Sequence, residues 1–280
     1  MNNGYVFVSD FFSDEILGGG ELNDQEAISI LSKKNDVIRI KSQKVDLSFL
    51  KKNIKKKFII SNFILLSNDC IKFLQENCKY IIYEHDHKYL VGRNPSIYPN
   101  FLAPKQSIIN HSFYKNACSV FCQSGFHKNI LQKNLQINNL VNLSGNLWSD
   151  DTLDILEKHS AKQKVQKASI MLSNIKHKNT KASVLYCEKK SIDYELIPSL
   201  GYHDFLSAMS NNDKLVFFPK TPETLSRIVV ECRMMGMKVI TNKLVGASME
   251  PWFKLKGKDL ILFMKNKKND ILLKIEEAFK

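Results

Sequence analysis

The stretch LVFFPKTPETLSRIVVECRMMGMKVIT (residues 215–241) is the most informative part of the sequence. Its first apolar run is typical of a buried strand, and the TPE that follows (residues 221–223) is typical of a helix start. Gly236 is typical of a helix end, and MKVIT after it is expected to form the next buried strand. The stretch therefore predicts a strand–loop–helix–strand unit that carries two carboxylates, Glu223 and Glu231, around the start of its helix.

Strand and helix signals alternate along most of the chain, which favours parallel sheets covered by helices. Six strands are expected in the first half: YVFVSDF, DVIRI, KFIIS, KYIIYE, SVFCQ and LVNLS. Helices are expected between them, most clearly Asn23–Lys34, Asn68–Asn77 and Ser124–Asn134, with Ser124 as an N-cap. The second half predicts the strands ASIMLS, YELIP, LVFFP, MKVIT and DLILFM, followed by an amphipathic helix over Asp270–Phe279.

A polar, lysine-rich segment, SDDTLDILEKHSAKQKVQK, separates the two runs of alternation and is typical of a linker or an exposed helix. We therefore expect an N-terminal Rossmann-like domain over residues 1–148, a linker over 149–166 and a C-terminal Rossmann-like domain over 167–280. Ligands bind such sheets at the carboxyl ends of the strands, so the loops after the strands are the candidate functional segments.

Composition limits the class of protein. The 280 residues are 44% hydrophobic without any run of eighteen apolar residues, so we expect a cytoplasmic protein with a substantial core and no membrane span. Six scattered cysteines without a CxxC pair indicate buried reduced thiols. The formal net charge of +13 rests almost wholly on lysine, which favours a solvated basic surface and leaves a polyanionic partner as the alternative.

Two first-half loops carry candidate chemistry. Gly18, Gly19 and Gly20 precede a helix, so they predict either a phosphate cradle of backbone N–H groups or a flexible turn. The segment EHDH (residues 84–87) is the densest titratable cluster. It is consistent with a histidine base or substrate-orienting histidine beside a carboxylate, with His-x-His metal ligation, or with polar loop residues that bond to each other.

The two glutamates of the opening stretch also have two interpretations. Glu223 would complement the dipole of a helix that Thr221 caps, a contribution of about 0.3 to 1 kcal/mol. Glu231 lies at the edge of the apolar stripe of that helix, where a buried carboxylate needs a partner. A hydroxylated ligand is one candidate for that partner.

The Glu-x7-Glu spacing, between a strand with a short loop and a helix that ends at Gly236 before KVIT, resembles the signature of GT-B fold glycosyltransferases, especially the retaining family 4 type. The glycine-rich loop resembles the GGxE-like loop of that family, and YEHDH resembles its histidine-bearing loop. SVFCQSGFHKNIL followed by LVNLSGNLW is similar to its crossover into the second domain. The chain looks most like short members encoded by phages of marine bacteria.

The resemblance implies a GT-B architecture, in which two Rossmann-like parallel-sheet domains face a cleft and the terminal helix packs back toward the first domain. It implies a catalytic set of His85, Glu223 and Lys178. It implies donor-binding residues in both domains: Gly19, Gly20, Ser173, Lys176, Lys178, Leu200, Gly201, Tyr202, Thr221, Glu223, Thr224, Leu225 and Glu231. Within this set Glu223 would bind the donor sugar, Glu231 the ribose, and the N–H groups of Thr224 and Leu225 the diphosphate. Asp86, His87 and Arg93 would lie on the acceptor side.

The phosphate clamp departs from the family pattern. The family places an arginine and then a lysine after the first strand of the second domain, and here Ser173 stands at the arginine position and Lys178 at the lysine position. Asn179 replaces the glycine that usually follows the lysine, and Lys176 is a candidate substitute for the missing cation.

The implied activity is transfer of a hexose from a nucleotide-diphosphate sugar, with UDP favoured, to an unidentified acceptor. The anomeric configuration would be retained, and the reaction would need neither a metal nor another cofactor. One alternative is a glycosyltransferase that acts on modified DNA bases, which would lose affinity steeply with salt. Another is a catalytically silent protein that binds a nucleotide-sugar or a glycan, in keeping with the missing arginine. The sequence leaves the acceptor and the oligomeric state open.

Overall fold

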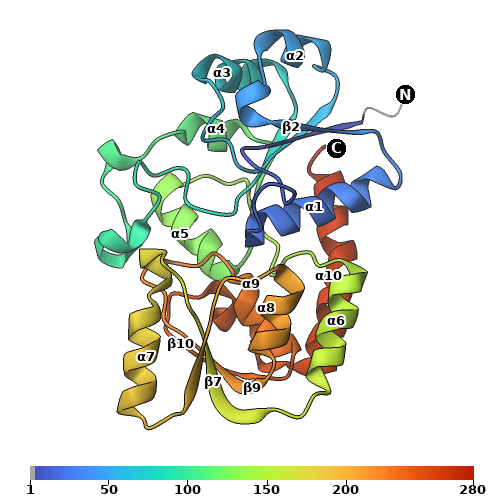
Figure 1. Cartoon of the computed structure of the whole chain (residues 1–280). Helices are drawn as coiled ribbons and strands as arrows, with labels where there is room; N and C mark the ends of the chain where they lie inside the picture. The colour runs from blue at the N-terminus through green and yellow to red at the C-terminus, as the bar shows by residue number, and fades with distance from the viewer. Residues whose placement is uncertain (1–3) are drawn as a thin grey trace. The chain divides into compact units, whose positions relative to one another are not determined.

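The computed structural model describes residues 4–280. The chain divides into two compact units, each an α/β unit with a parallel sheet, as the sequence predicted. Unit 1 consists of the residues up to Leu147 together with Lys268–Lys280, and unit 2 consists of Trp148–Lys267 (Figure 1).

The sheet of unit 1 has six parallel strands in the order β2-β1-β3-β4-β5-β6. All six strands predicted for the first half are confirmed: β1 (Tyr5–Ser9), β2 (Val37–Lys41), β3 (Lys57–Ile60), β4 (Tyr80–Tyr83), β5 (Ser119–Cys122) and β6 (Leu140–Asn142). The strands are short and almost continuously apolar because helices cover both faces of the sheet.

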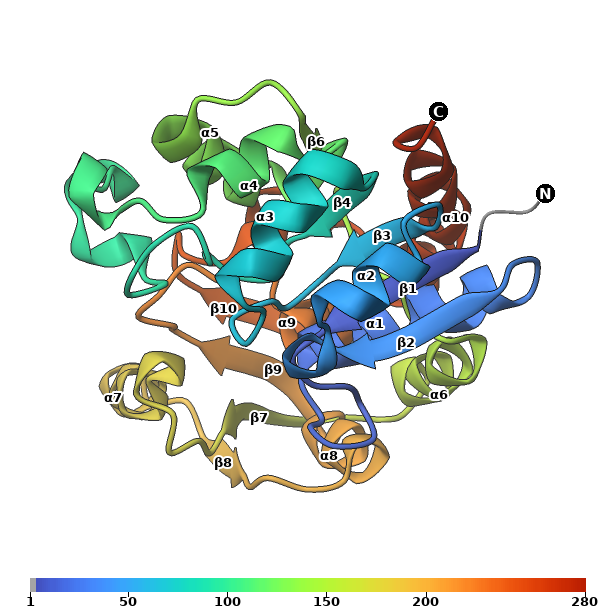
Figure 2. The same ribbon diagram turned by 90° about the horizontal axis from the view of Figure 1, so that it is seen from above.

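Alternate residues of each strand in unit 1 belong to two separate cores. Val6 and Val8 point to a core covered by α2 (Leu47–Lys52), α3 (Asn68–Asn77), α4 (His111–Asn116) and α5 (Gly125–Leu135). Tyr5 and Phe7 point to the opposite core, which is covered by α1 (Gly19–Ser32) and the end of α10 (Gly257–Glu277). Figure 2 shows these strands and helices from above. The prediction of Ser124 as an N-cap is confirmed, since its hydroxyl accepts the N–H of His127.

The sheet of unit 2 has four parallel strands in the order β10-β9-β7-β8. Its strands are β7 (Val165–Met171), β8 (Tyr194–Ile197), β9 (Asn212–Phe217) and β10 (Lys238–Thr241). One face is covered by α6 (Asp150–Ser160), α8 (Tyr202–Met209), α9 (Arg227–Met234) and the start of α10, and the other by α7 (Thr180–Lys189). Short 3-10 helices are η1 (Ser42–Lys44), η2 (Pro95–Ile97), η3 (Pro99–Phe101), η4 (Lys105–Ser107), η5 (Lys176–Lys178), η6 (Gly246–Met249) and η7 (Pro251–Lys254).

The C-terminal region differs from the prediction in one element. DLILFM (residues 259–264) is not a strand but part of the 21-residue helix α10. Leu260, Ile261 and Met264 have helical spacing, so one face of the helix fills the larger core of unit 2. The final turns bury Ile271 and Ile275 against the sheet of unit 1, which confirms that the terminal helix packs onto the first domain.

Residues 149–166 also have defined structure. They contain α6, which buries Leu153 and Leu156 in the core of unit 2, and the start of β7. The six cysteines are free, and four of them are buried. Among the helices of residues 4–280, none combines the length and the apolar character that a membrane span needs.

Candidate functional site

Each sheet contains one point at which the strand order reverses. In unit 1 this point lies between β1 and β3, and in unit 2 it lies between β7 and β9. Loops that leave such a pair of strands diverge to opposite faces of the sheet, and ligands of open α/β sheets bind there. Gly19 and Gly20 follow β1, His85 follows the next strand, β4, and Lys178 and Glu223 follow β7 and β9. Each unit therefore has its own candidate site at the carboxyl ends of its strands.

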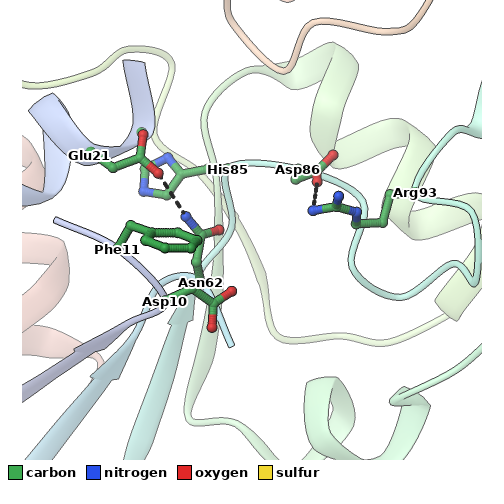
Figure 3. A pocket seen from close by; sticks show the side chains of 8 residues that line it. Asp10, Phe11, Glu21, Asn62, His85, Asp86 and Arg93 are labelled. Atoms are coloured by element: carbon green, nitrogen blue, oxygen red, sulfur yellow. Dashed lines mark hydrogen bonds and ion pairs between the residues drawn. The ribbon is translucent and has the colours of Figure 1, made fainter. Parts of the chain in front are cut away.

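A cavity of about 300 Å³ lies at this point in unit 1 (Figure 3). It is lined by Asp10, Phe11, Gly20, Glu21, Asn62, His85, Asp86 and Arg93. The sequence had singled out Gly20, His85, Asp86 and Arg93, and the structure brings these four together. Phe11, Glu21 and Asn62 form one side of the cavity, whereas Asp86 and Arg93 lie on the other as an ion pair of 3.2 Å.

His85 is held at both ring nitrogens. Its Nε2 lies 2.7 Å from Asp24 Oδ1, and its Nδ1 is bonded to Nε2 of Gln123. Asp24 is fully buried, and its other oxygen accepts the hydroxyls of Ser9 and Ser61. A carboxylate in this position fixes the orientation of the imidazole and keeps a proton on Nε2. The structure therefore supports the interpretation of His85 as a histidine oriented by a carboxylate.

Asp24 was not among the predicted residues, although the sequence contains its signal. Asp24, Ala27, Ile28 and Leu31 are spaced as one helical face, and all four are buried. A carboxylate on an otherwise apolar helical face needs a specific partner. Gln123 carried no comparable signal, because its role depends on the end of β5 lying beside the loop after β4.

Helix α1 begins at Gly19, four residues before the predicted start. Gly20 is needed for close approach, since a Cβ atom there would lie 3.3 Å from the His85 ring. The carboxylate of Glu21 folds back over Gly18 and accepts a hydrogen bond from its own backbone N–H. Burial raises the pKa of Glu21, and the hydrogen bond from its backbone N–H opposes that shift.

His87 lies in the core of unit 1, packed edge to face against His127 and Tyr89. It is 2% exposed, and neither ring nitrogen has a hydrogen-bond partner. Burial lowers the pKa of His87 to about 4, so the ring is neutral at neutral pH. Within residues 4–280 no three His, Cys, Asp or Glu side chains are grouped to hold a metal ion, so the arrangement gives the His-x-His metal interpretation no further ligands.

The candidate site of unit 2 is an ion pair between the loops after β7 and β9. Lys178 Nζ lies 2.8 Å from Glu223 Oε1, and these side chains are 26% and 15% exposed. Both were predicted catalytic residues. Asn179 has a positive φ of 57°, which explains how it replaces glycine, because asparagine tolerates the left-handed region better than most residues. Its Nδ2 also donates to the carbonyl of Phe218 and so joins the two loops.

Ser173, at the position where the resembled family has arginine, carries no charge. The Ser173 hydroxyl accepts the N–H of Ile175, and Thr180 accepts the N–H of Ser173, so Ser173 shapes the loop. Lys176 is exposed in η5, two residues before Lys178.

The helix after Glu223 starts later than predicted. Helix α9 begins at Arg227, so the expected start at Thr221 is wrong. The backbone of Glu223 is engaged in a parallel bridge, in which its N–H donates to Leu244 and its C=O accepts from Gly246. This bridge holds the segment extended, and consequently the N–H groups of Thr224 and Leu225 do not form the first turn of a helix.

Glu231 is buried beneath donors from three elements. Its Oε1 accepts Arg227 Nε at 2.7 Å, Trp148 Nε1 at 3.0 Å and the hydroxyl of Tyr202. The Arg227 guanidinium also lies 4.6 Å from the centre of the Trp148 ring. Each glutamate of the pair therefore has its own cation. Sequence reasoning missed Arg227, although its spacing of four residues from Glu231 on one helix was a usable signal.

The segment predicted to lie against the nucleobase is at the start of α8. Leu200 is 44% exposed, Gly201 is the N-cap, and Tyr202 reaches back to Glu231. Burial beside Glu231 raises the pKa of Tyr202, so its hydroxyl stays protonated and donates.

The sequence matches no protein-family model and no curated protein. The structure, by contrast, resembles solved glycosyltransferases over almost its whole length. HepE of Anabaena with UDP bound has a TM-score of 0.55 at 9% identity, with 99% of this chain and 92% of HepE covered. The sucrose-phosphate synthase of Thermosynechococcus elongatus has a TM-score of 0.55 at 10% identity, with 98% and 91% covered.

The lipopolysaccharide galactosyltransferase WaaB also matches, with a TM-score of 0.52 at 13% identity and coverage of 99% and 95%. The chain has the GT-B fold. In this GT-B chain the two parallel sheets have six and four strands, and both points of strand-order reversal carry predicted site residues.

Proposed function

We propose that the chain is a retaining glycosyltransferase that moves a hexose from a nucleotide-diphosphate sugar, with UDP favoured, to an acceptor hydroxyl. The observation that carries the proposal is the Lys178–Glu223 pair at the β7/β9 reversal point of a GT-B fold. Among the structural neighbours, HepE is seen with UDP and with UDP-glucose. Unit 2 would bind the donor, and unit 1 would supply His85 and the acceptor side.

The pair in unit 2 suits the two ends of a sugar diphosphate. The ammonium group of Lys178 has three donors and a full charge, so it can hold a diphosphate oxygen while it remains bonded to Glu223. Glu223 is 15% exposed and can accept hydroxyls of the sugar. Charge that develops on the departing diphosphate would be stabilised by Lys178, and preorganised contacts of this kind are commonly the largest contribution to catalysis.

Glu231 would act on the nucleoside part of the donor. Oε1 already accepts three hydrogen bonds, so a ribose hydroxyl would donate to Oε2 of the same carboxylate or replace one of these donors. The same bonds fix the Tyr202 ring beside Leu200 and Gly201, where the base would lie. Lys176 would supply a second cation for the diphosphate from the exposed side of η5.

The state of His85 supports retention of configuration. Both ring nitrogens are bonded within the protein, so His85 is not arranged to remove a proton from the acceptor, and it would contact the substrate through its ring carbons. In the proposed reaction the bond from the anomeric carbon to the diphosphate oxygen breaks, and the acceptor oxygen bonds to the same face of that carbon. The acceptor proton leaves with the diphosphate, so no protein base or nucleophile is required.

A donor panel tests this proposal. Thermal shifts measured with UDP-, GDP- and ADP-sugars should show stabilisation by one nucleotide class, since a ligand that binds only the native state raises its stability. That donor should then be hydrolysed or transferred slowly, and Glu223→Ala should abolish turnover. The absence of a shift with every donor, or full turnover in Glu223→Ala, would contradict the proposal.

One observation favours a second candidate, a protein that binds the nucleotide-sugar without turning it over. Ser173 supplies no charge where the family has arginine, so Lys178 is the one predicted clamp residue that is cationic at its family position. Donor binding that depends on Glu223, combined with no release of nucleotide during prolonged incubation with an acceptor panel, would identify this function.

A further inference from the structure

The cavity of unit 1 is acidic although the chain is strongly basic. Asp10, Glu21 and Asp86 contribute three carboxylates to its lining, and Arg93 contributes the one guanidinium, in a chain of net charge +13. No lysine lines it. The basic residues that give the chain its net charge are therefore not gathered at the cavity, and an anionic group there would meet like charge.

The start of α1 adds a second reason against an anion. A helix N-terminus normally favours negative charge because its first N–H groups lack partners. Here Glu21, in the first turn, turns its carboxylate back onto its own N–H and lies against Gly18. The side chain thus occupies the position that a phosphate would take, and a phosphate would first have to displace it.

The remaining lining suits a sugar ring. Phe11 lines the cavity and is 39% exposed, so part of its ring faces open space. An exposed aromatic face packs well against the C–H face of a pyranose, while amide and carboxylate groups bond its hydroxyls. Asn62 and Glu21 supply such groups beside Phe11 and are themselves joined by a bond of 3.4 Å (Figure 3).

We infer that the acceptor taken by this cavity is an uncharged sugar whose ring packs on Phe11, and that phosphorylated sugars and nucleic acid are rejected. The inference rests on the proposed function, because it concerns the acceptor of that reaction. The discrimination comes mainly from Glu21, because Asp86 is paired with Arg93 and the carboxylate of the buried Asp10 accepts the N–H groups of Ile64 and Leu65. The affinity for the ring comes from Phe11. Glycosyl transfer to DNA is correspondingly disfavoured, despite the net charge of the chain.

Matched ligand pairs test the inference. Methyl glycosides of glucose, galactose, mannose and N-acetylglucosamine, each with its 6-phosphate, are titrated at low salt in the presence of saturating UDP, with binding followed by ligand-detected NMR. At least one neutral glycoside should bind, and about fivefold more tightly than its phosphate, since unit charges of like sign about 4 Å apart in water repel each other by about 1 kcal/mol. Glu21→Gln should narrow this preference to about threefold. Glu76→Gln, the same change on the exposed surface of α3, should leave it intact.

Phe11→Ala should weaken binding of the neutral glycoside about fivefold. The control is Leu17→Ala on the same loop, which removes a side chain that is 62% exposed and does not line the cavity. If the 6-phosphates bind as tightly as the neutral glycosides, or if no glycoside binds while UDP does, the inference is wrong and the proposed function stands. Tight binding of a 12-mer oligonucleotide that falls steeply with salt would also overturn it. Failure of UDP itself to bind would overturn the proposed function first, and this inference with it.

Discussion

The two strand-order reversal points of this chain have the same topology and opposite chemistry. In unit 1 the helix starts within the glycines at Gly19, a buried Asp24 fixes His85, and three carboxylates line the cavity. In unit 2 the segment before α9 is extended, and the partly exposed Lys178 forms an ion pair with Glu223. The strand order therefore determines where in each sheet a site forms, whereas the local backbone conformation and the charged side chains determine which ligand it can bind. In the proposed function a diphosphate would bind at the second point and a neutral sugar at the first.

The largest effect is expected from removing the cation of the unit 2 site, Lys178. Lys178→Met should lower turnover of the donor by about a thousandfold, because charge on the leaving diphosphate loses its preorganised partner. The measurement is the rate of nucleotide release from the preferred donor. Lys181→Met, on the exposed first turn of α7, is the matched control and should retain its rate. An unchanged rate in Lys178→Met would place the phosphate clamp elsewhere.

Glu231, the buried glutamate of the pair, should contribute to the stability of the fold even when no ligand is bound. Glu231→Gln leaves Arg227 buried without its carboxylate and should lower the free energy of unfolding by about 3 kcal/mol without any nucleotide present. Urea unfolding measures this loss. Glu188→Gln, exposed on α7, should change stability by less than about 0.5 kcal/mol. A Glu231→Gln protein as stable as the wild type would show that the carboxylate serves ligand binding alone.

In unit 1, a substitution of Asp24 should lower turnover and leave donor binding unchanged. Asp24→Asn keeps the shape of the side chain and removes the charge that holds His85, so turnover should fall about a hundredfold. UDP affinity, measured by calorimetry, should remain unchanged. Asp69→Asn in the first turn of α3 serves as the control. Equal losses of UDP affinity and turnover would assign Asp24 to the donor site.

The buried imidazole of unit 1 predicts an acid-sensitive stability. The pKa of His87 is about 4 in the folded protein and about 6.5 when unfolded, so the unfolded state binds more protons. Its contribution is fully present above pH 6.5 and is lost as the pH falls toward 4. Between pH 7 and 5 the wild type should therefore lose about 2 kcal/mol more than His87→Phe in urea unfolding. Identical losses in the two proteins would show that His87 is charged or solvated in the fold.

Much of the fold followed from the sequence because apolar runs and helix signals are local. All six strands of unit 1, the capped helix α5 and the return of the terminal helix were predicted in this way. DLILFM was misassigned because a short apolar run does not distinguish a strand from a buried helical face. The late start of α9 was missed because the bridge between Glu223 and Val245 is a tertiary contact.

The candidate sites were predicted in part for the same reason. His85, Lys178 and Glu223 were predicted from segments that resemble glycosyltransferase motifs, and the structure pairs the last two. Gln123 and Trp148 act through contacts with residues 38 and 83 positions away, which no local pattern reveals. Asn179 departs from the glycine of the resembled motif in sequence, but its positive φ keeps the backbone conformation that glycine would adopt there.

The most direct test of the assignment of the donor to unit 2 is calorimetric titration of UDP into three proteins: wild type, Lys178→Met and Asp24→Asn. The account predicts that UDP binds the wild type, that Lys178→Met weakens binding at least about tenfold through loss of a charge-assisted bond, and that Asp24→Asn binds like the wild type. Full UDP affinity in Lys178→Met together with lost affinity in Asp24→Asn would contradict it, because the diphosphate would then bind at the acidic cavity of unit 1.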